Sequence, residues 1–341
     1  MRSTRRAIAD GASMLNRRAF VAGVGAGLLG LPLVGAAQQP GRVWRVGFFY
    51  FGARESSLSE GRYRAFVDGM RALGYTEGRN LVIESRFAES DAERLPALAA
   101  ELKQSGVDVI VAAGSPVYRV LRTADVPVVV TVTADPMIEG LAASLARPGG
   151  NFTGLTDTAT VLGPKHLDLL REALPRLAKL GALTNPDNGS HREQLQGVVQ
   201  AAHNVGIQVV PVGAATVPEI DAAFAALTRE RAGACLMFGD TFFTQALEQI
   251  AQAAISHRIP SIYLPREFAR AGGLMSYGPD FVDNFRRAAS FVDRILKGAK
   301  PGELSFEQPT KYVFAINART ARTLGIKVPQ TLLLRADEVI E

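Results

Sequence analysis

The stretch Val126–Asp157 decides the fold and reads VPVVVTVTADPMIEGLAASLARPGGNFTGLTD. It begins with a β-branched run over residues 126–132, which is typical of a buried strand. Pro136 ends any strand ladder there because proline has no backbone N–H. A turn over residues 148–151 then leads into a second short strand that begins at Phe152. Open α/β sheets bind ligands at strand ends of this kind.

The rest of the chain predicts strands that alternate with helices in two series. The first series has strands over 43–50, 81–86, 107–113 and 126–132, helices over 60–73 and 91–103, and a helix with Ser115 as N-cap and Pro116 at its first position. The second has helices over 163–174, 192–205, 217–229 and 242–257, and strands over 177–184, 207–212, 234–238 and 261–264. Such alternation predicts an α/β fold with two lobes, each built on a parallel sheet.

Several blocks carry a family resemblance, in this order: Gly74–Asn80, Arg94–Leu102, Asp135–Pro136, Arg147–Gly154, Gly272–Gly278, Glu307–Lys311 and Arg335–Glu341. Together they resemble the ABC transporter substrate-binding protein family that includes the tryptophan- and tyrosine-type binding proteins. The resemblance covers nearly everything after residue 43. It implies a type I periplasmic binding protein architecture, with two Rossmann-like lobes and a ligand cleft between them.

The resemblance also implies three crossings between the lobes, near Thr156–Thr160, Gly272–Tyr277 and Ser305–Tyr312. The N-terminal lobe would then comprise 43–157 plus 273–305, and the C-terminal lobe 158–272 plus 306–341. A helix over 280–296 would return to the first lobe, and the tail from Phe314 would pack on the second.

Residues 1–37 read as an export signal of the twin-arginine type. Arg17 and Arg18 precede an apolar run over 19–34, and small residues over 35–37 suit cleavage. The alternative is a membrane anchor, but glycines and Pro32 interrupt the run. We therefore expect a periplasmic protein without a stable membrane span after processing.

The charge of the chain belongs largely to this signal. The full sequence of 341 residues carries a net +5. Without residues 1–37, which hold five Arg and one Asp, 304 residues with a net +1 remain. No basic stripe is left to suggest a nucleic-acid partner. Gly25–Gly30 fits G-x-G-x-x-G, but no strand precedes it, so we expect no dinucleotide or other cofactor.

Six candidate ligand-binding residues follow expected strands, where a cleft would be built. They are Phe51, Ser115, Asp135, Asn185, Asp240 and Tyr263.

Each candidate has a chemical reason and a plainer alternative. Ser115 opens a helix whose free N–H groups suit a carboxylate, or it only caps that helix. Asp135 and Asp240 could hold an ammonium group, or form Asx-turns and caps. Asn185 can donate and accept hydrogen bonds, or sit in an ordinary Asn-Pro turn. The rings of Phe51 and Tyr263 could wall a small organic ligand, or pack in the core.

No catalytic or metal-binding pattern emerges. The four histidines, at 166, 191, 203 and 257, lack metal-ligand spacing, and we expect them to be solvated. G-x-S-x-G and Walker A motifs are absent from the sequence. We therefore expect no enzyme and no metal site.

The predicted function is capture of a small amino-acid-like or organic-acid ligand and its delivery to an ABC transporter permease by a monomer. The alternatives are an exported Rossmann-like enzyme and a ligand-sensing partner of a receptor. The loop Tyr50–Glu55 lacks the His-Pro-x-Leu-Asp wording of the tryptophan-type members, so the resemblance does not fix an aromatic ligand.

Overall fold

A computed structural model describes residues 42–341, and the predicted export signal over residues 1–37 lies outside this range. The described chain forms two sheets, which we call the first and the second lobe together with their covering helices. The predicted α/β class with two parallel-sheet lobes is confirmed.

The first sheet has five strands, all parallel, in the order β2-β1-β3-β4-β5. The strands are β1 (Trp44–Tyr50), β2 (Leu81–Phe87), β3 (Val109–Ala113), β4 (Val128–Val130) and β5 (Phe152–Gly154). Its helices are α1 (Arg54–Ser59), α2 (Arg62–Ala72), the short η1 (Ala92–Arg94), α3 (Leu95–Gln104) and α4 (Ser115–Leu121).

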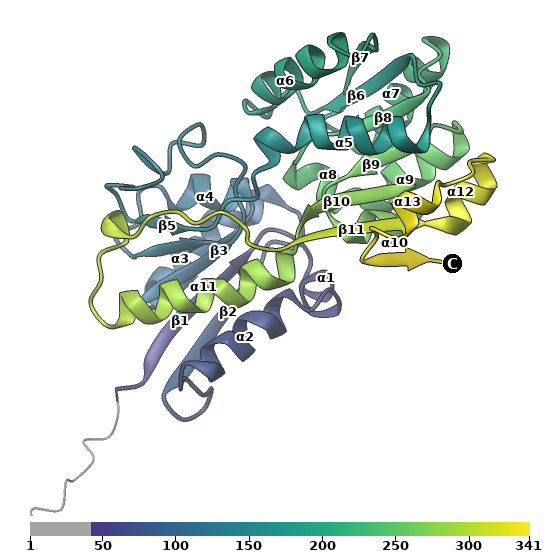
Figure 1. The fold of residues 1–341 in the computed structure, drawn as a ribbon. Helices are drawn as coiled ribbons and strands as arrows, with labels where there is room; N and C mark the ends of the chain where they lie inside the picture. Colours follow the sequence, from purple (N-terminus) through teal and green to yellow (C-terminus); the bar gives the residue numbers. More distant parts are fainter. Residues whose placement is uncertain (1–41) are drawn as a thin grey trace, which may run out of the picture. The chain divides into compact units, whose positions relative to one another are not determined.

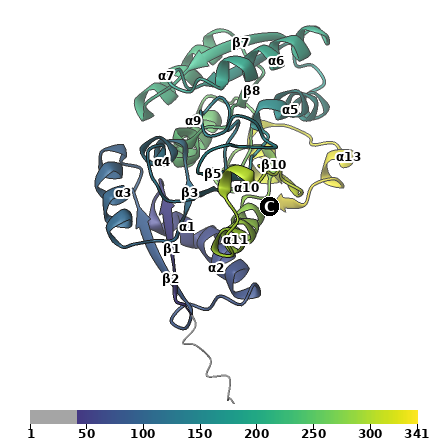
Figure 2. The same cartoon turned by 90° about the vertical axis from the view of Figure 1, so that its left-hand side faces the viewer.

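Alternation along β1 builds a core on each face of this sheet. Val46 and Phe48 pack among residues of α2, whereas Phe49 packs among residues of α3 and α4. Figure 2 shows α2 and α3 on opposite sides of β1 and β2. Both faces of the parallel sheet are therefore covered, which leaves the strand ends for function.

A late helix completes the first lobe. The helix α11 (Phe281–Leu296) lies beside α2 although about two hundred residues separate them (Figure 1). A Cβ on Gly69 would stand 2.6 Å from the carbonyl oxygen of Arg286, so only glycine allows this close approach. The Tyr75 hydroxyl donates to Asp293 across the same contact at 2.9 Å. Through these contacts α11 packs on the first lobe.

The second sheet has seven strands in the order β12-β11-β10-β9-β8-β6-β7, with one antiparallel pair, β10 and β11. The strands are β6 (Lys179–Thr184), β7 (Gln208–Gly213), β8 (Ala234–Met237), β9 (Ser261–Tyr263), β10 (Met275–Pro279), β11 (Tyr312–Asn317) and β12 (Glu338–Ile340). The helices are α5 (Ala159–Ala173), α6 (His191–His203), α7 (Val217–Arg229), α8 (Thr241–Gln245), α9 (Leu247–Ser256), α10 (Arg266–Arg270), α12 (Ala318–Leu324) and α13 (Gln330–Leu333), and η2 (Pro301–Glu303) precedes β11.

Two separate cores flank this sheet as well. Residues of α7, α9 and α10 pack on one face, and residues of α5, α6, α12 and α13 pack on the other. Phe314 and Ile316 of β11 belong to the second of these cores, as expected for the tail. No helix within residues 42–341 is both long and apolar enough to span a bilayer.

Three details differ from the sequence-based expectation. The strand β10 pairs with β9 and β11, so residues 275–279 belong to the second lobe and the crossing to α11 follows Pro279 rather than lying near Gly272–Tyr277. The helix expected over 242–257 is split because Ala246 leaves the helical backbone region (φ −96°, ψ 22°). The strand expected over 126–132 is shorter in the structure, where it is β4. Side chains donate hydrogen bonds to the carbonyls of Val126 and Val132 at its two ends.

Candidate ligand-binding site

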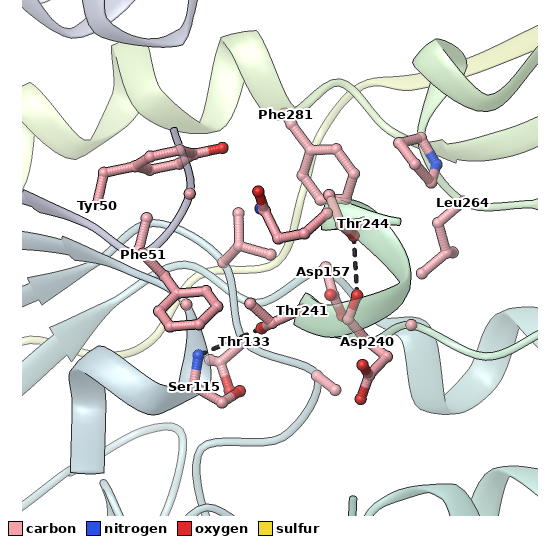
Figure 3. Close-up of a pocket in the computed structure, with 18 of the residues that line it drawn as sticks. Tyr50, Phe51, Ser115, Thr133, Asp157, Asp240, Thr241, Thr244, Leu264 and Phe281 are labelled. Carbon is pink, nitrogen blue, oxygen red and sulfur yellow. Dashed lines mark hydrogen bonds between the residues drawn. The ribbon is translucent and has the colours of Figure 1, made fainter. Parts of the chain in front are cut away.

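A cavity is lined by loops from both lobes at the C-terminal ends of their strands. It encloses about 90 Å³, several times the roughly 10–15 Å³ that one water molecule needs. Figure 3 shows Tyr50 and Phe51 on one side, Leu264 on the other and Asp157 between them. The cavity is therefore large enough for a small organic molecule and is reached by side chains of both lobes.

The turn before α4 shapes the first-lobe side. Gly114 has φ 108°, and a Cβ there would stand 2.8 Å from the Cβ of Phe51, so glycine is required. Gly114 is also the residue that precedes the helix, and Ser115 is the first helical residue. The prediction that Ser115 is the N-cap is therefore wrong, because the turn places the special backbone conformation one residue earlier. Both Ser115 and Phe51 line the cavity.

A carboxylate that the sequence reasoning missed faces the cavity from the segment between β5 and α5. Asp157 is only 6% exposed, and its Oδ1 accepts the backbone N–H of Ala159 at 2.8 Å. No side chain of residues 42–341 donates a hydrogen bond to it, and the bond from Ala159 engages Oδ1, which leaves Oδ2 for a ligand. Burial raises the pKa of Asp157 to about 6. The sequence could have indicated Asp157, because it is an acidic residue within the expected crossing Thr156–Thr160, beside the cleft.

Glu139 is a second carboxylate of the cavity that the sequence reasoning missed. Its Oε1 accepts the hydroxyl of Thr133 at 2.7 Å, and both residues line the cavity. Burial raises the pKa of Glu139 to about 7, with a smaller contribution from the nearby charge of Asp157. Two acidic groups in one cavity favour a ligand with a cationic group.

Asp240 also lines the cavity, but the protein itself uses its carboxylate. Its Oδ1 accepts the backbone N–H groups of Phe242 at 2.7 Å and Phe243 at 3.2 Å, which caps α8. Its Oδ2 accepts the side-chain amide of Asn188 at 2.7 Å, and Asn185 donates to both oxygens at 3.2 Å. The plainer interpretation of Asp240 as a cap therefore accounts for most of its hydrogen bonds.

Asn185 and Asp135 lie outside the lining of the inner cavity. Asn185 lines a wider cavity that shares Phe51, Ser115 and Asp240 with the inner one, so it belongs to the mouth of the site. Asp135 accepts the backbone N–H groups of Met137 at 2.7 Å and Ile138 at 3.1 Å. The structure thus places Asp135 in its own turn and does not bring it together with the other candidates.

Aromatic rings form the apolar walls. Tyr50, Phe51, Tyr263, Phe281 and Phe285 all line the cavity. The Tyr263 hydroxyl donates to the carbonyl of Asp240 at 3.0 Å, and burial raises its pKa, so this residue offers its ring rather than an ionised oxygen. A ligand with an apolar or aromatic portion would be well packed here.

A buried arginine, also missed, completes the lining. Arg62, the first residue of α2, is 5% exposed and donates from Nη1 to the Tyr50 hydroxyl. Its Nη2 lies 2.7 Å from Oε2 of Glu60. The guanidinium group of Arg62 is therefore part of the cavity wall and is shielded from solvent.

Direct hydrogen bonds join the two lobes across the site. Ser90 donates to Oε1 of Gln245 at 3.0 Å, and the backbone N–H of Ser115 donates to the Thr241 hydroxyl at 3.4 Å. Both acceptors are residues of α8, which Asp240 caps. The mouth of the cavity is therefore bridged by polar groups of the two lobes.

Two of the four histidines are buried, contrary to the expectation that all are solvated. His191 is 3% exposed, accepts from the N–H of Asn185 at 2.8 Å and contacts the Gly239 carbonyl at 3.1 Å. His166 is 2% exposed and contacts the Tyr277 carbonyl at 2.6 Å. Burial lowers the pKa of both, so they act as neutral hydrogen-bonding groups. No cluster of three His, Cys, Asp or Glu side chains within residues 42–341 has the geometry to hold a metal ion.

Comparison with known proteins agrees with this architecture. The sequence profile of the family described as "ABC transporter substrate binding protein" matches residues 56–340. A tyrosine-binding protein of Clostridioides difficile is 23% identical over 266 residues, which cover 77% of this chain and 76% of that protein.

Solved structures resemble the fold over most of the chain. A conserved domain protein of Vibrio cholerae is 26% identical, with a TM-score of 0.80, and covers 87% of this chain and 100% of its own. An ABC domain of Streptococcus pneumoniae, solved in complex with L-Trp, is 24% identical with a TM-score of 0.79 and the same coverage. At 24% identity, the likeness to the Streptococcus pneumoniae domain shows a shared fold only.

Proposed function

Because this chain belongs to the ABC transporter substrate-binding protein family, we propose that it captures a small amino-acid-like ligand between its lobes and delivers it to an ABC importer. Substrate-binding proteins of importers act outside the cytoplasm, and we place this one in the periplasm, where the predicted export signal would send it. In this proposal the protein is a monomer without catalytic activity that hands its ligand to a permease.

The observation that carries the ligand class is the carboxylate of Asp157. It is buried in an aromatic-lined cavity with one oxygen unused by the protein, and Glu139 adds a second acidic group. An ammonium group would supply the missing donor and the opposite charge. The relatives support the same class, since one is a tyrosine-binding protein and another was solved with L-Trp.

The carboxylate of the ligand would bind on the first-lobe side. Ser115 lines the cavity there, and its backbone N–H gives only a long 3.4 Å hydrogen bond to the Thr241 hydroxyl, whereas the Thr133 hydroxyl already donates to Glu139. No Lys or Arg lies in the Gly114–Ser115–Pro116 turn, so uncharged donors would bind the ligand carboxylate. Phe51 and Tyr263 would pack on the apolar portion, and Asn185 would support Asp240 at the mouth.

Calorimetric titration tests the ligand class directly. L-tyrosine and its desamino counterpart, 3-(4-hydroxyphenyl)propionate, differ in the ammonium group alone. We expect the desamino acid to bind about a hundredfold more weakly, because the buried carboxylate of Asp157 would remain unpaired. Native mass spectrometry of the purified protein would identify any ligand that co-purifies. Equal affinities for the two compounds would overturn the ammonium assignment.

Delivery is tested in cells. Deletion of the gene should lower uptake of the labelled ligand, and the wild-type gene should restore it whereas Asp157→Asn should not. Fractionation should find the mature chain in the periplasm. Unchanged uptake in the deletion strain would argue against a transport role.

A further inference from the structure

Arg62 has buried donors that the protein leaves without acceptors. Within residues 42–341 its Nε and Nη2 have no hydrogen-bond partner, although the side chain is 5% exposed and lines the cavity. The Nη2 group is 2.7 Å from Oε2 of Glu60, but that oxygen also lacks a hydrogen bond, so the pair is a charge contact without hydrogen-bond geometry. Buried guanidinium N–H groups are normally satisfied, so these donors call for an acceptor.

The charge of Arg62 is already balanced. Glu60 and Glu267 both act on the guanidinium electrostatically, and the Tyr50 hydroxyl accepts from Nη1. A further anion would meet the repulsion of these two carboxylates. What the group lacks is an acceptor atom rather than a counter-ion, and an uncharged oxygen meets that need.

Two aromatic rings of the cavity lie close to Arg62. Its guanidinium carbon is 6.0 Å from the centroid of the Tyr50 ring and 5.9 Å from that of Phe281. Figure 3 shows these two rings on the side of the cavity opposite Ser115, with Asp157 between the two sides. A ligand held by its ammonium and carboxylate would therefore direct its side chain toward Arg62.

Resting on the proposed function, we infer that Arg62 selects amino acids whose side chain ends in an uncharged acceptor oxygen, either a hydroxyl or a carbonyl. Hydrogen bonds from Nε and Nη2 to that oxygen would satisfy the buried donors. An amino acid without the oxygen would leave them unpaired, and sites built to bond a polar group reject such analogues strongly.

Matched ligand pairs test the inference in the wild-type protein. L-tyrosine and L-phenylalanine differ by a hydroxyl, and L-glutamine and L-methionine compare a carbonyl-tipped chain with an apolar one. We expect the oxygen-bearing member of at least one pair to bind about tenfold or more tightly in calorimetry. The pair that responds identifies the source of the oxygen. We expect 4-carboxy-L-phenylalanine, which carries an anion, to bind more weakly than L-tyrosine.

Variants separate hydrogen bonding from charge. The double variant Glu60→Gln/Arg62→Met removes donor and counter-ion together and should reduce the preference to less than about threefold. Its affinity for the apolar member should stay within about threefold of wild type, which shows a folded site. Glu60→Gln alone keeps the donors and should improve the binding of 4-carboxy-L-phenylalanine relative to L-tyrosine.

The outcomes are distinguishable. Equal affinities within both pairs, tightest binding of 4-carboxy-L-phenylalanine to wild type, or a preference that survives in the double variant would each overturn the role of Arg62. Failure of all five amino acids to bind would overturn the proposed ligand class, and this inference with it.

Discussion

The segment after β8 and the segment after β5 both bring an aspartate to the cavity, but they use it differently. Asp240 accepts two backbone N–H groups and two side-chain amides, so its carboxylate holds α8 and the mouth of the site together. Asp157 accepts one backbone N–H and keeps an oxygen unused. A position at a strand end is therefore not enough to make a carboxylate available to a ligand. What decides its availability is the number of hydrogen bonds that the carboxylate already accepts from the protein.

The largest effect is expected for Asp157→Asn. This variant keeps the size of the side chain but loses the charge opposite the ammonium, so affinity for L-tyrosine should fall by about a hundredfold or more. Unfolding should change little, because the amide oxygen can still accept the N–H of Ala159. Calorimetry and thermal melts check both. Retained affinity would place the ammonium elsewhere and remove the contrast with Asp240.

A pH titration sharpens the same contrast. The pKa of Asp157 is raised by burial to about 6, so between pH 7 and pH 5 its carboxylate becomes protonated in the ligand-free protein. The affinity for an ammonium ligand should then fall about tenfold, and this dependence should be much weaker in Asp157→Asn.

Stability should respond to pH with the opposite sign. The folded-state pKa values of Asp157 and Glu139 exceed their ordinary values, so the folded protein binds more protons than the unfolded chain at mildly acidic pH. The contribution of these two groups to the free energy of unfolding should therefore increase as the pH falls from 7 to 5. Comparing the melting temperature of wild type with that of an Asp157→Asn/Glu139→Gln variant isolates it. Parallel pH dependence in the two proteins would contradict the assignment.

A smaller effect on affinity is expected for Asp240→Asn. The substitution weakens the cap of α8. It also places an amide NH2 group beside the side-chain amides of Asn185 and Asn188, which donate to the carboxylate in the wild type. The free energy of unfolding should therefore fall by about 1–2 kcal/mol. The loss of affinity should be only severalfold and equal for L-tyrosine and its desamino counterpart. A loss confined to L-tyrosine would return the ammonium role to Asp240.

The smallest effect is expected for Ser115→Ala. Its hydroxyl is one of several neutral donors on the first-lobe side, and the backbone donors remain. Affinity should therefore fall by about 0.5–1.5 kcal/mol, equally for the amino acid and the desamino acid, since both carry the carboxylate. Calorimetry with both ligands checks this, and an unchanged affinity would leave Ser115 as a structural residue of the turn.

Much of the fold could be predicted from the sequence because it follows from local patterns. The β-branched runs and helical periodicities located the strands from β1 to β9 and most of the longer helices, and α7 matches its expected bounds of 217–229, whereas β10 to β12 and the short helices α1, α10, α12 and α13 were not predicted. The membership of β10 in the second sheet could not be read in this way, since it depends on pairing with β9 and β11, which are distant in sequence.

The site was predictable only in part. Of the six candidates at strand ends, four line the cavity, namely Phe51, Ser115, Asp240 and Tyr263, because parallel strands point their carboxyl ends to one edge. Arg62 and Glu139 were missed because neither follows a predicted strand, and Asp157 was missed although it lies in the expected crossing Thr156–Thr160, after the strand that begins at Phe152. Their burial and unused polar atoms arise from tertiary packing, which no local pattern encodes.

Asp157 has one further consequence, for the kinetics of binding. Its backbone N–H donates to the Thr133 carbonyl of the first lobe, while its side chain accepts from Ala159 at the start of α5 in the second. A group at the crossing moves least when two lobes rotate about it. We therefore expect Asp157 to keep its position when the lobes open, so that a ligand ammonium could reach it in the open protein before the mouth closes. We expect the residence time of the ligand to shorten when the hydrogen bond from Ser90 to Gln245, which joins the two lobes, is removed.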